Sequence, residues 1–133
     1  IDGTEDKYAK DIVSTYGNIQ NIDFCGLLPL DEVYKYYQKS SCLIFPSKLE
    51  TWGLPISEAK EFDLPMIVAN LEYAHETVGV YDKVCFFDPD NANELASLMK
   101  KALDKEPIFK KANYVNTSQN CCHTWKEIIE KID

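Results

Sequence analysis

The chain contains no arginine, and all 14 of its basic residues are lysines, set against 22 acidic residues. The resulting net charge of −8 argues against binding to DNA or RNA, because their phosphates require a basic protein surface. Arginine is also the side chain best suited to a bidentate clamp on phosphate groups. The composition therefore disfavours tight binding of a diphosphate by this chain alone.

Long hydrophobic runs and paired cysteine motifs are also missing. No stretch approaches the roughly 20 apolar residues of a membrane-spanning helix, and the given sequence shows no signal peptide. The cysteines are odd in number and lack the C-x2-C spacing of zinc sites. We predict that Cys25, Cys42 and Cys85 are small buried hydrophobic residues in a protein of the reducing cytoplasm. Because the chain of 133 residues does not begin with Met, we interpret it as part of a longer protein.

Hydrophobic periodicity predicts helices that alternate with short apolar strands. The predicted helices cover residues 4–16, 31–37, 54–62 and 72–78, and a further helix ends at residue 103; Thr4 caps the first, and Asn91 or Asn93 caps the last. The predicted strands cover residues 21–25, 41–45, 64–69 and 84–87. A last amphipathic segment is predicted from residue 107 to 129. Such alternation implies right-handed crossovers and a parallel sheet covered on both faces. The sequence therefore predicts one α/β domain over residues 1–133, a doubly wound, Rossmann-like parallel sheet.

Open parallel sheets bind ligands beyond the carboxyl ends of their strands. The segments that follow the predicted strands are residues 26–27, 46–53, 70–73 and 88–89. We therefore expect Gly26, Glu50 and Gly53 to lie on the functional rim of the sheet.

Glu50 and Glu58 are the most informative pair on this rim. Glu50 lies in the loop after an apolar strand, and Glu58 lies one turn into the next helix, with Gly53 between them. A helix N-terminus offers backbone N–H groups and a favourable dipole to phosphates, and carboxylates accept hydrogen bonds from sugar hydroxyls. This arrangement is suited to a phosphorylated sugar ligand.

Residues 45–59 resemble the signature of the retaining glycosyltransferases of family 4, the group 1 type, which have the GT-B fold. The shared features are two glutamates with seven residues between them and Trp52-Gly53 where the family usually has Phe-Gly. Residues 21–28, 41–47, 65 and 86–89 resemble further family motifs in the same order. The family's usual glycine after the signature helix is replaced by Asp63.

The resemblance implies roles for individual residues. Glu58 would accept hydrogen bonds from the ribose hydroxyls of a nucleotide, and Glu50, the candidate catalytic residue, would face the transferred sugar. Backbone amides would lie against the sugar and the diphosphate, and a glycine-containing loop would contact the base. These further donor-binding positions are Trp52, Gly53, Leu54, Gly26 and Leu27.

The same resemblance implies a larger enzyme. The chain would be the C-terminal half of a GT-B fold without its first strand, and the catalytic histidine and acceptor site would lie in an N-terminal domain outside this chain. The enzyme would transfer a sugar from a nucleotide diphosphate sugar to a glycan or lipid-linked acceptor of the cell surface, such as capsule or lipopolysaccharide. No cofactor or metal would be required. We expect a cytoplasmic location, with peripheral association at the inner face of the membrane as an alternative.

Other interpretations stay open. The chain could belong to a sugar-nucleotide epimerase of the GT-B fold or be a non-catalytic nucleotide-binding or interaction module. Trp52 is predicted to pack beneath its loop rather than to stack on a ligand, and Lys48 could approach a phosphate or remain solvated. His75 and His123 are predicted to be structural or solvated rather than acid–base groups.

Overall fold

The computed structural model describes residues 1–114, which form two compact units. The first unit is Ile1–Ser40, and the second begins at Ser41. The second unit confirms the predicted α/β class, since strands and helices alternate along it. The expectation that residues 1–133 act as one domain stays a prediction.

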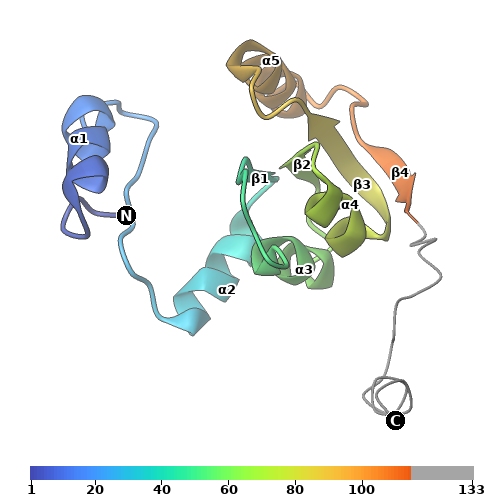
Figure 1. The fold of residues 1–133 in the computed structure, drawn as a ribbon, viewed down its shortest axis with the longest axis horizontal. Coiled ribbons are helices and arrows are strands. Elements are labelled where there is room, and N and C mark those ends of the chain that lie inside the picture. Colours follow the sequence, from blue (N-terminus) through green and yellow to red (C-terminus); the bar gives the residue numbers. More distant parts are fainter. Residues whose placement is uncertain (115–133) are drawn as a thin grey trace, which may run out of the picture. The chain divides into compact units, whose positions relative to one another are not determined.

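A four-stranded sheet forms the centre of the second unit (Figure 1). Its strands lie side by side in chain order, and the first three are parallel while the last runs antiparallel. The strands are β1 (Leu43–Phe45), β2 (Met66–Ala69), β3 (Val80–Phe87) and β4 (Lys110–Asn113). All four residues of β2 are buried, as expected for a central strand covered on both faces.

Helices cover the sheet, and they are α3 (Leu54–Glu61), α4 (Glu72–Val78) and α5 (Ala92–Leu103). On one face, Ile67 and Phe87 form a buried cluster against which Leu95 and Leu98 of α5 pack. Successive side chains of a strand point to opposite faces, so the fully buried Met66 belongs to the other face. Helix α4 lies on that other face, where His75 stacks on Phe86 with ring centroids 4.0 Å apart.

The polar segment of β4 corrects the prediction for the end of the chain. An amphipathic segment was expected from residue 107 to 129, yet Lys110–Asn113 pairs with the free edge of β3. Its residues are mostly exposed and carry no apolar alternation, so only pairing with the edge of β3 makes this segment a strand. The rest of the expected segment lies outside the described residues.

The first unit contains α1 (Lys7–Tyr16) and α2 (Leu30–Lys39). The predicted strand over residues 21–25 is wrong, because these residues form no strand. A strand needs a neighbour for its backbone hydrogen bonds, and within residues 1–40 no other strand is present.

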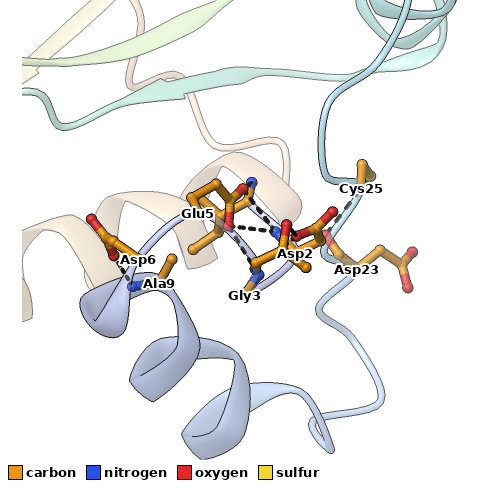
Figure 2. Close-up of polar contacts among 9 residues, drawn as sticks. Asp2, Gly3, Glu5, Asp6, Ala9, Asp23 and Cys25 are labelled. Carbon is orange, nitrogen blue, oxygen red and sulfur yellow. Dashed lines mark hydrogen bonds and ion pairs between the residues drawn. The ribbon is translucent and has the colours of Figure 1, made fainter.

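The start of α1 also differs from the prediction, which placed the cap at Thr4. Asp6 is the N-cap, and its Oδ1 accepts a hydrogen bond from the Ala9 amide at 2.7 Å (Figure 2). Upstream, Glu5 accepts the amide of Gly3 at 3.0 Å, so the backbone before the helix is held by a second carboxylate. Thr4 instead donates its hydroxyl to Asp2 at 2.6 Å.

Asp63 shows why a glycine is common after the signature helix of the resembled family. Its φ is 53°, in the left-handed region that glycine adopts without steric cost. The Asp63 amide bonds to the carbonyl of Lys60 and the Leu64 amide bonds to that of Ala59, both at 3.0 Å. These two bonds close the end of α3 in a Schellman motif.

No helix among the described residues combines the length and the apolar character needed to cross a bilayer.

Candidate functional site

The loop between β1 and α3 holds most of the candidate site. It leaves the carboxyl end of β1 at Pro46 and ends at Gly53, the N-cap of α3. Gly53 adopts φ 75° and ψ 54°, a left-handed conformation that a residue with a Cβ adopts at a cost. Pro55 occupies the first turn of α3, where its missing N–H leaves no hydrogen bond unmade. The sequence thus turns the chain sharply and points the N-terminus of α3 toward the rim of the sheet.

The two signature glutamates are both carried by the second unit. Glu50 is exposed in the loop, and Glu58 is partly buried within α3. The β1–α3 connection therefore presents one carboxylate from the loop and one from a regular helix. Carboxylates at these positions can accept hydrogen bonds from a polyhydroxylated ligand.

Trp52 corrects the expectation of a residue packed under the loop. Its side chain is 58% exposed, and its indole Nε1 donates to the Ser57 hydroxyl at 3.1 Å. This hydrogen bond fixes the indole on the first turn of α3 while leaving much of its surface open to solvent. Leu54, at the start of the same helix, is also exposed, at 61%.

Gly26 and Leu27, the predicted base-contacting positions, lie in the first unit. Gly26 has φ 62°, and its amide donates to the Ile1 carbonyl at 3.2 Å. A Cβ placed on Gly26 would lie 2.9 Å from Oδ2 of Asp2, so this glycine accommodates a close approach of its own N-terminal segment. Leu27 is 98% exposed. Figure 2 shows the polar contacts of this segment around Asp2.

Lys48 lies in the same loop as Glu50, and its Nζ forms an ion pair with Asp90. Asp90 belongs to the turn after β3, so the ion pair joins two segments that follow the carboxyl ends of parallel strands. The chain has no arginine. Of the segments that follow the three parallel strands within residues 41–114, only the β1–α3 loop carries a lysine, Lys48.

We expected that the site requires no metal, but the sequence contains one Asp-x-Asp spacing, Asp88-Pro89-Asp90, of a kind that occurs in metal sites. Carboxylates at such spacing can bind divalent cations. Here the Asp88 side chain accepts the Asp90 amide at 2.9 Å, and the Asp90 carboxylate faces Lys48. In the described part of the chain, no three His, Cys, Asp or Glu side chains are grouped so that they could share a metal ion.

The histidine and cysteine predictions fare differently. His75 has structural contacts, since its Nε2 lies 2.7 Å from Oδ1 of Asn70 and its ring stacks on Phe86; His123 lies outside the described residues. Cys25 was predicted to be buried and is exposed. Cys42 is half-buried, and burial raises its thiol pKa to about 11, which keeps it protonated at neutral pH.

Two residues that sequence analysis did not single out support the loop from α4. The Tyr73 hydroxyl donates to the Ser47 carbonyl at 2.6 Å, and the buried Thr77 hydroxyl donates to the Trp52 carbonyl. No motif marks them, because each acts on a segment about 25 residues away along the chain.

Comparison with known proteins gives the family. The model of the family described as "Glycosyl transferases group 1" matches residues 2–120, which is most of the chain. The resemblance noted from the two glutamates and their neighbours is thereby confirmed over both units.

Curated relatives agree with this match. Three Escherichia coli proteins, each described as "Serotype-specific mannosyltransferase WbdA", are 25% identical over 115 residues. The alignment covers 86% of this chain and 14% of each relative, so the chain spans about one seventh of their length. No solved structure gives a significant match. The chain belongs to the group 1 glycosyl transferases.

Proposed function

We propose that this chain is the nucleotide-sugar-binding part of a retaining glycosyltransferase. The observation that carries the proposal is the β1–α3 connection, where Glu50 and Glu58 flank a left-handed Gly53 at the start of α3. Within a group 1 glycosyl transferase domain, this connection supplies carboxylates for sugar hydroxyls and a helix N-terminus for phosphates.

Each signature residue has a separate role in this proposal. Glu58 accepts hydrogen bonds from the vicinal hydroxyls of the ribose, because one carboxylate can accept two donors together. Glu50 faces the transferred sugar and positions its reacting carbon. The backbone amides of Trp52, Gly53 and Leu54 lie against the sugar and the diphosphate. Glycine at position 53 allows the ligand to approach the backbone closely.

Gly26 and Leu27 contact the base in this proposal, largely through their backbone. The donor is a substrate, so no separate cofactor takes part. In the transfer step the bond between the anomeric carbon and the diphosphate oxygen breaks, the acceptor hydroxyl oxygen forms the new bond on the same face of that carbon, and the hydroxyl proton leaves with the departing nucleoside diphosphate. Stabilising the charge that develops on the diphosphate is the main catalytic contribution of this part of the enzyme.

The proposed enzyme as a whole is a hexosyltransferase of cell-surface polysaccharide synthesis. Support comes from the relatives, which are described as serotype-specific mannosyltransferases. A mannosyl or related hexosyl donor and a glycan or lipid-linked acceptor follow from that likeness. Acceptor binding would fall to a domain outside this chain, and a cytoplasmic enzyme at the inner membrane face would meet a lipid-linked acceptor there.

Ligand titration tests the proposal directly. The chain is titrated by calorimetry with UDP, GDP, ADP, UDP-glucose and GDP-mannose. We expect one nucleotide and its sugar to bind selectively. Glu58→Gln should weaken that binding about ten- to a hundredfold, since a hydrogen bond to a charged group contributes roughly 1.5–3 kcal/mol.

Glu61→Gln is the matched control, because Glu61 is an exposed glutamate of the same helix. It should leave binding unchanged. Thermal unfolding of both variants checks that α3 remains folded. Absence of nucleotide binding both in this chain and in a longer protein that contains it would contradict the proposed function.

A further inference from the structure

Helix α4 reaches across to the loop between β1 and α3 at both ends of that loop. The Tyr73 hydroxyl donates to the Ser47 carbonyl at 2.6 Å, near the exit from β1. The Thr77 hydroxyl donates to the Trp52 carbonyl, immediately before α3. Tyr73 and Thr77 lie one turn apart on the helix, so a single rigid element holds the two ends of the loop.

The burial of Thr77 makes its hydrogen bond consequential, while Tyr73 is partly buried. Thr77 is 4% exposed, so water cannot readily replace a lost partner there. Its hydroxyl lies within bonding distance of two carbonyls, those of Trp52 and, at 2.9 Å, of Tyr73. A hydroxyl has one proton to donate, and the closer contact is with Trp52.

The Tyr73 ring provides a third contact with the same loop. A Cβ placed on Gly53 would lie 3.2 Å from Cε2 of Tyr73, so the ring packs directly against the glycine backbone. Burial raises the pKa of the Tyr73 phenol, and the nearby negative charge of Glu50 raises it further. The phenol therefore stays protonated at neutral pH and remains a hydrogen-bond donor.

The loop has little internal structure of its own. Between Ser47 and Trp52 the only hydrogen bond that we identify runs from the Ser47 hydroxyl to the Leu49 carbonyl, at a long 3.4 Å. Glu50 is exposed midway along this span. Fixing both ends of a short segment limits the conformations that its middle can adopt.

We propose that Tyr73 and Thr77 are positioning residues that hold the loop so that Glu50 and the Trp52 and Gly53 amides meet the sugar of the donor. This inference rests on the proposed function for its ligand and on the contacts of α4 for its mechanism. Loss of either contact should affect binding of the sugar but not binding of the nucleotide. The reason is that Glu58, which is assigned to the ribose, is carried by α3 rather than by the loop.

The test uses Tyr73→Phe and Thr77→Val, each of which removes a hydroxyl and keeps the bulk of the side chain. Backbone ¹⁵N order parameters of residues 48–52 are measured without ligand. In the unmodified chain they should be near those of rigid backbone, about 0.85, and in each variant they should fall toward about 0.6. Thr77→Ser, which keeps the hydroxyl, should restore the rigid values.

Tyr81→Phe is the matched control, because the Tyr81 hydroxyl also donates to a backbone carbonyl, that of Leu64 at 2.9 Å, but does not touch the loop. It should cost stability without changing the order parameters of residues 48–52. Equal loop order parameters in Tyr73→Phe, Thr77→Val and Tyr81→Phe would overturn the inference.

Ligand binding supplies the second measurement. The gain in affinity of the nucleotide sugar over the free nucleotide should fall about three- to tenfold in Tyr73→Phe, as one hydrogen bond contributes roughly 1 kcal/mol, while affinity for the free nucleotide stays within about twofold. An equal loss for both ligands would overturn the inference. Failure of the unmodified chain to bind any nucleotide would instead overturn the proposed function, and the order parameters are measured independently of that result.

Discussion

Lys48 and Asp90 form an ion pair that joins the loop after β1 to the turn after β3, across 42 residues of sequence. Both side chains are mostly exposed, at 59% and 80%. Exposed ion pairs contribute only about 0–1 kcal/mol, so a stronger anion can displace Asp90 with little loss of stability. In a chain without arginine, we expect Lys48 to exchange Asp90 for the diphosphate of the proposed donor.

Substitution of the two partners should therefore affect nucleotide binding in opposite directions. Lys48→Gln should weaken binding of the preferred nucleoside diphosphate about three- to tenfold and reduce its dependence on salt. Asp90→Asn should strengthen binding up to about threefold, because the competing carboxylate is removed. Calorimetry at low and high salt measures both effects. Weaker binding in Asp90→Asn would show instead that Asp90 orients Lys48 for the ligand.

Gly53→Ala should destabilise the chain by about 1–2 kcal/mol. The residue sits at φ 75°, and an added Cβ would lie 3.1 Å from Ile56 and 3.2 Å from Tyr73. Urea denaturation gives the change in the free energy of unfolding. Lys105→Gly is the control of opposite sign, because Lys105 has φ 58° at the end of α5; it should stabilise by up to about 1 kcal/mol. A neutral Gly53→Ala would mean that the loop can relax into another conformation.

Asn91→Ala should cost about 1 kcal/mol of stability, whereas Asn93→Ala should change it by less than about 0.5 kcal/mol. The sequence left both residues open as the cap of α5, and the structure selects Asn91, whose Oδ1 accepts the Glu94 amide at 3.0 Å. Asn93 lies within the first turn and is exposed. Thermal or urea unfolding of the two variants decides between them, and equal losses would contradict this assignment.

Stability should fall at alkaline pH through Tyr81. Burial, with smaller contributions from the negative charges of Asp63 and Asp82, raises the pKa of its phenol to about 12. A phenol with a folded pKa above its unfolded value of about 10 contributes stability that is fully present below pH 10. That contribution is lost as pH rises from about 10 through 12, because the unfolded state releases the proton first.

Tyr81→Phe isolates this effect from the other groups that titrate at high pH. The difference in unfolding free energy between the two proteins is measured in urea from pH 9 to 12. It should shrink across this range as the tyrosine loses its advantage. A difference that is independent of pH would contradict the raised pKa.

Local sequence signals placed most of the second unit correctly. The apolar runs gave β1 and β2, Pro55 marked the first turn of α3, and the 72–78 pattern matched α4. These features depend on side chains within a few residues of one another, which is why they can be read along the chain. The position of Glu50 on a loop and of Glu58 on a helix follows from the same signals.

Features that depend on distant partners were missed. Residues 21–25 have an apolar strand-like pattern but no neighbouring strand in their unit, whereas the polar β4 becomes a strand because β3 has a free edge. Trp52 was expected to pack and is held at the surface by Ser57. The two strand assignments depend on whether a neighbouring strand is present, whereas the Trp52 contact is local, and its hydrogen bond to Ser57 outweighed the expected packing.

The sequence by itself determined the α/β class, the carboxylate pair of the β1–α3 connection and the membership of the group 1 glycosyl transferases, because these rest on spacing and local pattern. Only the tertiary structure decided which side chains support that connection. Tyr73 and Thr77 hold the ends of the loop, and Asp90 pairs with Lys48. Hydrogen bonds and ion pairs between residues far apart in sequence form only when folding has brought their elements together.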